Sequence, residues 1–440
     1  MRSGRSLLFW CSFVIQAVVT QPVLRGGLND WTNISPPAGN VEHIEFDSAN
    51  PQNVYSLLAG VLYRSSDGGQ TWNLVDSLST PDGIINIAPD PSRSGTLYAA
   101  PYIGGIAKST DYGQTWEFVG LPNQFVSQIG VHPMKPWILF AMTSPGLFRS
   151  TDRGVSWRLT GANLPNMQHL AFSGSNPTVI YAGAFQKSTD DGETWQTTGG
   201  LYQSVAVHPQ DPQTVIGWTS SEIGKSTDGG NTWRVTYRPQ PSIYTLVFSR
   251  ANPDVLYAGT RYYDGLYRST DAGETWKPSN AGLGNYDVQV LAVQPGQDGS
   301  PERVLAGTRG SGFFVSNDSG ATWATSNSGV RQAQVSAFAV NSKDGTLYTG
   351  VQAGGFFRSK DFGRTWQQIN QGLPMIRARG LQIDLYNPDV LFSILDVKLY
   401  RSTDGGDSWE AQEQRLDQNP QVNGVTPDPA HPGYWFVTGS

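Results

Sequence analysis

The sequence predicts an all-β fold that is assembled from copies of one repeated unit. An eight-residue pattern recurs nine times between residues 65 and 409, and short runs of alternating apolar and polar residues lie between the copies. No stretch after residue 20 shows helical periodicity. A length of 440 residues would by itself suggest two to four domains, but the repeats take precedence over that expectation.

The repeated pattern is Ser-x-Asp-x-Gly-x-Thr/Ser-Trp, from Ser65–Trp72 to Ser402–Trp409. Every copy keeps the Ser, Asp, Gly and Trp, and the aspartates are separated by 44, 41, 38, 38, 43, 47, 43 and 43 residues. The Asp and Ser side chains can hydrogen-bond to the backbone of a hairpin turn, and the glycine can supply a positive φ. The Trp then points into the core, where nine of the 14 tryptophans would lie.

Four short strands can be placed around each copy. A module opens with an apolar strand such as Thr245–Phe248, and a second strand such as Asp254–Thr260 follows after a turn. A third strand such as Gly265–Ser269 enters the repeated motif, and the residues after the Trp form the fourth. Four antiparallel strands at a period near 42 residues are typical of a propeller blade.

The nine copies resemble Asp-box repeats, also called bacterial neuraminidase repeats. These repeats occur in sialidases, xyloglucan-cleaving glycosidases, photosystem II assembly factors and the sortilin-type receptor domain. The resemblance covers residues 30 to 440 and implies a β-propeller in which the boxes lie away from the active or ligand face. It therefore implies a structural role, without catalysis or metal binding, for Asp67, Asp111, Asp152, Asp190, Asp228, Asp271, Asp318, Asp361 and Asp404.

The two ends of the chain carry pieces of a further blade. Residues 423–440 match the first two strands of a module, and Asp30–Ile34 match the Trp and the fourth strand that follow a box. We therefore expect residues 21–440 to form one ten-bladed ring that closes by pairing of the N- and C-terminal strands. The sortilin-type domain has ten blades, but its cysteine-rich segment is absent here. An alternative is the front part of a longer tandem-propeller protein, like the xyloglucan-cleaving enzymes.

The first twenty residues differ in composition from the rest. Arg2 and Arg5 precede an apolar run from Leu7 to Val19, which predicts a signal peptide over residues 1–20 and a secreted, periplasmic or cell-surface protein. An uncleaved anchor is the alternative, and only in that case would the membrane be a partner. Cys11 is the single cysteine, which excludes an intrachain disulfide framework, a Cys-based metal site and a redox pair.

The charge pattern and the histidines exclude several classes of function. The chain has 30 Lys and Arg against 36 Asp and Glu, without a block of like charge, so nucleic acid is not an expected partner. The five histidines sit at repeated turn or strand-start positions and show no metal-ligand spacing. We expect a monomer without a metal or other cofactor.

The loops that differ most between repeats predict a ligand face opposite the boxes. They are rich in tyrosine and arginine, which suit sugar or peptide binding. The candidate ligand-binding residues are Arg261, Tyr262, Tyr263, Tyr286, Arg309, Arg331, Arg377 and Arg379, and Arg238 and Tyr244 flank a Pro-rich link beside them. A solvated rim without a ligand is the competing interpretation.

Two enzyme classes are alternatives to a binding function. The Arg-Ile-Pro signature that sialidases carry near their N terminus is absent, which argues against a sialidase. An inverting glycosidase needs two carboxylates about 6.5–9.5 Å apart, and Asp264 with Asp287 is the candidate pair, with Glu222 in reserve. The main expectation is non-catalytic binding of a glycan or a protein segment, with a xyloglucan-cleaving glycoside hydrolase as the alternative. A photosystem II type of assembly factor is a third class, but its resemblance is to a smaller ring.

Overall fold

The structure is a computed structural model that describes residues 24–26, 31–33 and 39–439. Within the last range it leaves out residues 76–77, 79–82, 161–168, 183–185, 201, 203, 239–241, 250–251, 262–263, 295–300, 329–334, 342, 352–353, 362, 374–379, 385–386, 396–397, 413–421 and 428–433. The predicted signal peptide, Cys11, Tyr262, Tyr263, Arg331, Arg377 and Arg379 lie outside the described residues.

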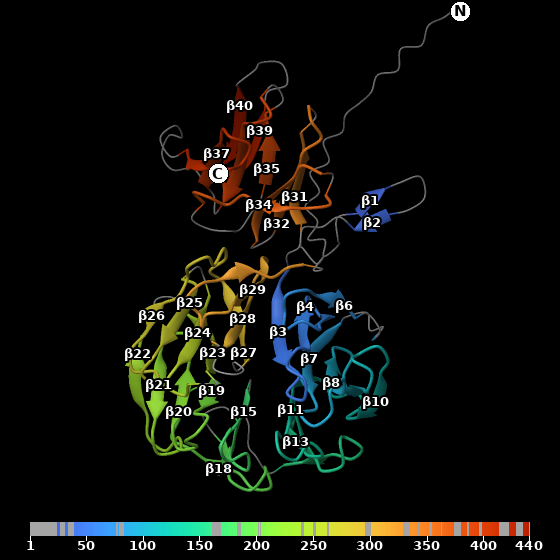
Figure 1. Cartoon of the computed structure of the whole chain (residues 1–440), viewed down its shortest axis with the longest axis vertical. Helices are drawn as coiled ribbons and strands as arrows, with labels where there is room; N and C mark the ends of the chain where they lie inside the picture. The colour runs from blue at the N-terminus through green and yellow to red at the C-terminus, as the bar shows by residue number, and fades with distance from the viewer. Residues whose placement is uncertain are drawn as a thin grey trace, which may run out of the picture.

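The described residues form nine antiparallel four-stranded sheets and two two-stranded sheets, which confirms the all-β propeller fold. In each four-stranded sheet the strands follow one another in sequence order, so that each repeat is one blade (Figure 1). We number the blades 1 to 9 along the chain. None of the described residues belongs to a helix with the length and apolar composition that a membrane crossing requires.

The first strand of each blade contributes apolar side chains to the contact with a neighbouring blade, as Val41, Ile44 and Phe46 do in blade 1. These inner strands are β3 (Val41–Phe46), β7 (Ile84–Pro89), β11 (Val126–Val131), β15 (Leu170–Phe172), β19 (Ser204–Val207), β23 (Ile243–Phe248), β27 (Val288–Gln294), β31 (Val335–Val340) and β35 (Gly380–Ile383). The second strands are β4 (Val54–Leu58), β8 (Leu97–Pro101), β12 (Leu139–Thr143), β16 (Ile180–Ala182), β20 (Val215–Trp218), β24 (Leu256–Thr260), β28 (Arg303–Thr308), β32 (Leu347–Val351) and β36 (Leu391–Leu395).

The third and fourth strands flank the Asp box. The third strands are β5 (Val61–Ser65), β9 (Ile106–Ser109), β13 (Gly146–Ser150), β17 (Gln186–Ser188), β21 (Ile223–Ser226), β25 (Leu266–Ser269), β29 (Gly312–Ser316), β33 (Gly355–Ser359) and β37 (Lys398–Ser402). The fourth are β6 (Asn73–Leu74), β10 (Glu117–Gly120), β14 (Arg158–Leu159), β18 (Gln196–Thr197), β22 (Arg234–Tyr237), β26 (Lys277–Pro278), β30 (Ala324–Thr325), β34 (Gln367–Gln368) and β38 (Glu410–Ala411). The two-stranded sheets pair β1 (Leu24–Gly26) with β2 (Trp31–Asn33) and β39 (Val422–Pro427) with β40 (Trp435–Gly439).

Each Asp box is a closed set of hydrogen bonds. In the fifth copy, the hydroxyl of Ser226 donates to Asp228 at 2.8 Å and accepts from the amide of Gly230 at 2.8 Å. The same oxygen, Oδ1, accepts from the amide of Thr232 at 2.9 Å, and Oδ2 accepts from the Thr232 hydroxyl at 2.6 Å. The bond from the Thr232 hydroxyl is the main reason that the pKa of Asp228 falls to about 2. The same bonds recur around the other eight aspartates, whose carboxylates therefore serve the turn itself.

The box glycine is required by the neighbouring blade as well as by the turn. Gly69 has a φ of 90°, a conformation that other residues rarely adopt. A Cβ built on Gly69 would lie 2.8 Å from the Leu305 side chain of blade 7. The box of blade 1 is therefore in direct contact with blade 7.

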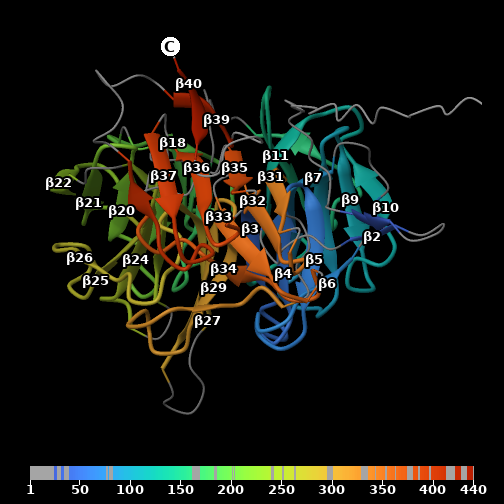
Figure 2. The same cartoon turned by 90° about the horizontal axis from the view of Figure 1, so that it is seen from above.

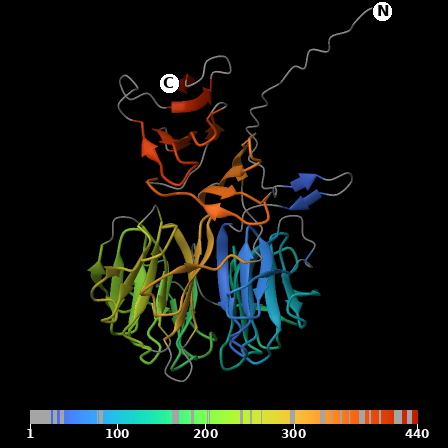
Figure 3. The same cartoon turned by 45° about the horizontal axis from the view of Figure 1, so that its top comes forward.

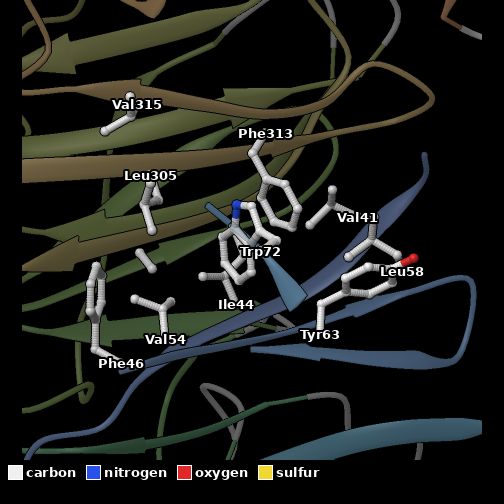
Figure 4. Close-up of a cluster of buried hydrophobic side chains, with 11 residues drawn as sticks. Val41, Ile44, Phe46, Val54, Leu58, Tyr63, Trp72, Leu305, Phe313 and Val315 are labelled. Carbon is white, nitrogen blue, oxygen red and sulfur yellow. The ribbon is translucent and has the colours of Figure 1, made fainter. Parts of the chain in front are cut away.

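Blade 1 closes a ring of seven blades by packing on blade 7. Trp72 stacks on Phe313 with ring centroids 4.1 Å apart and an interplanar angle of 11° (Figure 4). Its indole Nε1 donates to the carbonyl of Ser326 at 3.0 Å, and its amide donates to Ser328 at 2.8 Å. Trp323 joins blade 7 to blade 6 in the same way, because its Nε1 and amide donate to Ser279 and Ala281 at 2.8 Å each.

The expected ten-bladed ring with paired terminal strands was therefore wrong. The inner face of blade 1, with Ile44 and Phe46, shares one buried cluster with Leu305 and Val315 of blade 7. The terminal strands pair locally within β1–β2 and β39–β40 instead of with each other. The number of blades in a ring follows from the angle at which successive blades pack, and the boxes are alike in all blades.

Blades 8 and 9 and the β39–β40 hairpin form a second unit that lies beside the ring (Figure 3) and in front of it in the view of Figure 2. Blade 8 packs on blade 9 through Phe356, Ile369 and Trp409, and blade 9 packs on the hairpin through Phe392 and Trp435. The unit touches the ring where Ser311 of blade 7 lies 3.5 Å from the carbonyl of Gly354 in blade 8. The chain thus continues the repeat beyond the closed ring.

We predict that Trp72→Ala destabilises the protein by about 3–5 kcal/mol, because it empties a packed site at the closure of the ring. Trp137→Ala is the matched control, since Trp137 is 46% exposed. Urea unfolding followed by circular dichroism measures both. Equal stability of the two variants would show that the contact between blades 1 and 7 does not hold the ring.

We also predict that stability depends on pH in the acid range. Aspartate in an unfolded chain has a pKa of about 3.9, whereas the bond from Thr365 lowers the pKa of Asp361 to about 2 and the bond from Thr232 does the same for Asp228. The folded state therefore prefers the charged form, so this contribution is complete above about pH 4 and is lost as the pH falls toward 2.

The measurement is the thermal midpoint between pH 7 and pH 2. A Thr232→Val/Thr365→Val variant should be less stable than the parent protein at pH 7 but lose less stability between pH 5 and pH 2. Without those bonds, the pKa values of the two aspartates in the folded state lie closer to the value in the unfolded chain. Thr236→Val, outside the boxes on β22, serves as the control. Superimposable curves for the double variant and the parent would contradict the prediction.

Candidate functional site

The inner strands of the seven-bladed ring surround a central channel of about 850 Å³. Side chains from β3, β7, β11, β15, β19, β23 and β27 line it, together with Trp218, Thr219, Ser220 and Arg261 from two neighbouring turns. The apolar residues of these strands face the neighbouring blades. Side chains from all seven blades thus converge in the channel.

A β-bulge shapes the mouth of the channel. In blades 1, 2, 3, 6 and 7 the register shifts at the second residue of the inner strand. An unpaired residue of this kind re-aims its side chain. The five bulge residues all line the channel, and they are Glu42, Ile85, Ser127, Tyr244 and Gln289. The bulge lies beside the turn between the second and third strands, because the amide of Arg261 in that turn donates to Ser242 at 2.8 Å. This is the face opposite the boxes.

Tyr244 and Arg261 form a flat surface at the mouth. The Arg261 guanidinium lies 4.4 Å from the centre of the Tyr244 ring, and Tyr244 remains 45% exposed. The Nε of Arg261 is buried and has no hydrogen-bond partner among the described residues. Of the residues that the sequence singled out, Tyr244 and Arg261 are the two that the structure brings together in the channel.

A ring of equivalent positions follows the bulge, with one residue from each blade. All seven side chains line the channel, and they are His43, Asn86, Gln128, His169, Ser204, Thr245 and Val290. His43 donates from Nε2 to the carbonyl of Ile87 in blade 2 at 3.0 Å, and Asn86 accepts from the amide of Ile129 in blade 3 at 2.9 Å. Gln128 likewise accepts from Leu170 in blade 4 at 2.8 Å. These three polar residues therefore join successive blades along the channel wall.

The two histidines of this ring differ from ordinary surface histidines. Desolvation in the channel wall lowers the pKa of His169 to about 4, and the charge of His43 acts in the same direction. His169 is therefore neutral at pH 7, and its ring meets Trp218 edge to face at 6.0 Å. The Nε2 of His43 also lies 3.5 Å from the Glu45 carboxylate. In the sequence both histidines lie at the start of a first strand, and alignment of the repeats on their boxes places them at one equivalent position.

Glu42 is the acidic residue at the mouth. Burial raises its pKa, while bonds from the amide of Gly60 and the side chain of Asn40 oppose that rise. Those bonds reach its two carboxylate oxygens at 3.2 Å each. A carboxyl group whose pKa is raised in a cavity is suited to proton transfer or to donating a hydrogen bond to a ligand. No sequence motif singles out Glu42.

The carboxylates nominated from the sequence lie outside the channel lining. Asp264 accepts from the hydroxyl of Tyr267 at 2.8 Å, and burial together with this bond raises the pKa of Tyr267. Asp287 is 2% exposed at the link into blade 7. Glu222 pairs with Arg238 at 3.2 Å and lies 3.4 Å from the hydroxyl of Tyr202. All three carboxylates are thus occupied or buried within their own loops.

The remaining described candidates belong to the rim. The amide of Arg309 donates to the carbonyl of Asp287 at 3.0 Å, which places Arg309 in blade 7 at the position that Arg261 holds in blade 6. The carbonyl of Tyr286 accepts from Gly265 at 2.9 Å, and the Tyr286 ring is exposed. Within the described ranges no group of three or more His, Cys, Asp and Glu residues could hold a metal ion.

Comparison with known proteins matches the repeats and the fold. The model of the BNR-Asp box repeat matches residues 356–369, and that of the BNR/Asp-box repeat matches residues 267–278. The chain is 28% identical over 252 residues to a protein of Neosartorya fischeri named as an oligoxyloglucan-reducing end-specific xyloglucanase, which covers 54% of this chain and 25% of that protein. It is 32% identical over 159 residues to a xyloglucanase of Hypocrea jecorina, which covers 34% of this chain and 19% of that protein.

The chain therefore spans a quarter or less of the length of these curated relatives. Among solved structures, the GH74 xyloglucanase from Xanthomonas campestris superposes with a TM-score of 0.51 at 18% identity, over 92% of this chain and 84% of that one. This likeness concerns the fold alone. The chain therefore carries Asp-box repeats on a β-propeller fold.

Proposed function

We propose that this protein binds a glycan of the xyloglucan class at the mouth of its channel, on the face opposite the boxes. One observation carries the proposal: Tyr244 is 45% exposed at the mouth, and the Arg261 guanidinium lies 4.4 Å from the centre of the Tyr244 ring. The two relatives are named for action on xyloglucan, which suggests the ligand class. The proposal places the protein outside the cytoplasm, with export directed by residues 1–20.

The chemistry of the mouth suits a sugar. An exposed aromatic face can stack on the apolar face of a pyranose ring, while amide, hydroxyl and carboxyl groups bond its hydroxyls. Tyr244 provides the face, and Gln289, Ser127 and Glu42 line the same channel. The channel volume of about 850 Å³ is within the range of small-molecule sites.

Hydrolysis is the second candidate, and Glu42 favours it. Its raised pKa is what a general acid needs, and the relatives are named as xyloglucanases. However, a glycosidase places two carboxylates on either side of the bond that it cleaves. Among the described channel-lining residues the acids are Glu42 and Glu45, both from strand β3 of blade 1. We therefore favour glycan binding without cleavage over hydrolysis.

We predict that residues 21–440 bind xyloglucan oligosaccharides and that Tyr244→Ala weakens binding about tenfold, which corresponds to about 1.4 kcal/mol of lost stacking. Isothermal titration calorimetry measures the affinity. Phe118→Ala is the matched control, because Phe118 is an exposed aromatic residue on the outer strand of blade 2. Equal losses from both variants would place the sugar elsewhere on the protein.

We further predict that the folded protein releases no new reducing ends from xyloglucan, mixed β-glucans or sialosides. A reducing-sugar assay tests this with the parent protein, Glu42→Gln and Asp264→Asn/Asp287→Asn. Release that Glu42→Gln abolishes would instead establish a hydrolase at the channel mouth. Release that only the double variant abolishes would move the reaction to the loops of blades 6 and 7.

A further inference from the structure

The rim of the channel carries a second exposed aromatic surface, in blades 2 and 3. Tyr102 is 57% exposed, Phe125 is 48% exposed, and their ring centroids lie 5.9 Å apart at an interplanar angle of 86°. Ile103, the residue after Tyr102, is 52% exposed. We call these three residues the aromatic patch. Exposed apolar side chains that gather at one place on a folded surface are typical of a binding site.

The aromatic patch lies on the same face as Tyr244 and Arg261. The amide of Tyr102 donates to the carbonyl of Gly83 at 3.0 Å. In blade 6 the amide of Arg261 donates to the carbonyl of Ser242 at 2.8 Å in the same way. Tyr102 and Arg261 therefore hold equivalent positions in the turn between the second and third strands. This turn lies at the mouth of the channel, opposite the boxes.

Phe125 belongs to the link that leads from blade 2 into blade 3. It directly precedes strand β11, as Asp287 directly precedes β27 in blade 7. Ser127, two residues after Phe125, is the bulge residue of blade 3 and lines the channel. Tyr244 is the bulge residue of blade 6. Both aromatic surfaces therefore border the same mouth.

The packing of the blades does not account for the aromatic patch. Blade 1 has Ala59 at the position of Tyr102, because the amide of Ala59 makes the same turn bond, to Asn40 at 3.2 Å. Asn40 in turn directly precedes β3, as Phe125 precedes β11. A blade can thus form with a small and a polar residue at these two positions. Loops that depart from a repeat in this way are where a rigid scaffold acquires its binding specificity.

We propose that the aromatic patch is a second sugar site, and that one glycan chain contacts both the patch and Tyr244 across the mouth. The inference rests on the proposed function, because the same class of ligand occupies both sites. The exposed ring of Tyr102 or Phe125 offers an apolar face to a pyranose ring. In blade order, Gln289 of blade 7 and Glu42 of blade 1 come between the two sites, and both line the channel. Their polar groups can bond the hydroxyls of the chain.

A chain that contacts both sites gains affinity from its length. Once one part of the chain is bound, the rest is held near the second site, so the second contact forms at a high effective concentration. A short oligosaccharide can occupy only one site at a time. The ligand of this face is therefore a polysaccharide chain, which the two aromatic sites distinguish from its short fragments.

The test is titration calorimetry of the protein with xyloglucan chains of increasing length, from a single repeating oligosaccharide to the polymer. The affinity per repeating unit should rise at least about tenfold along the series. In Tyr102→Ala/Phe125→Ala this rise should disappear. Trp137→Ala is the matched control and should keep the rise. Trp137 is a 46% exposed aromatic residue of blade 3, and its carbonyl accepts from the box residue Arg153, which places it on the opposite face.

A second variant separates the loss of stacking from a loss of structure. Tyr102→Phe/Phe125→Tyr keeps both rings and should therefore keep the rise with chain length. A parent protein that binds short and long chains equally, or a folded double alanine variant that retains the whole rise, overturns the second site while the proposed function stands. A parent protein that binds no chain of any length refutes the proposed function and the second site together.

Discussion

The packing of each blade on its neighbours is the interaction on which the rest of the structure depends. A single four-stranded sheet of short strands cannot bury its apolar faces alone, so each blade is stable only between two neighbours. Trp72, Trp323 and Trp409 each donate an indole hydrogen bond to the preceding blade. Asp67 and its counterparts hold the turn that aims these tryptophans. The boxes therefore stabilise the ring although their aspartates lie at its surface.

The channel is a consequence of the same packing. Inner strands that meet at their apolar faces must turn their edges toward the axis, and the bulge at the second residue lets Glu42, Tyr244 and Gln289 point there. Since apolar packing needs only alternate residues of an inner strand, the channel positions are free to vary from blade to blade. His43, Asn86 and Gln128 use this freedom to join neighbouring blades, whereas Tyr244 and Arg261 remain available to a ligand.

The sequence predicted the blades well and their number in the ring badly, for one physical reason. The box and the strand alternation are local, so nine motifs located nine sheets and even single strands such as Leu266–Ser269. Ring closure depends instead on the tilt between blades, and Ile44 looks the same in sequence whether blade 7 or blade 10 covers it. The same distinction applies to the candidate site. Arg261 and Tyr244 lie in or beside loops that differ between repeats, so the sequence identified them as candidates. Glu42 and His169 lie at strand starts that recur in every repeat, so the sequence did not distinguish them.

Copies of the same repeat thus differ within one chain in whether a neighbouring blade covers their apolar face. In the first seven blades this face of the inner strand is covered, and the apolar residues at the position of Ile44 are buried. From blade 8 onward the same pattern of residues continues, but Phe338 and Phe436 are exposed because no described blade faces them. Burying a large apolar side chain stabilises a structure by about 1.5–3 kcal/mol. Phe338 and Val340 therefore form an apolar face of blade 8 that no described blade covers.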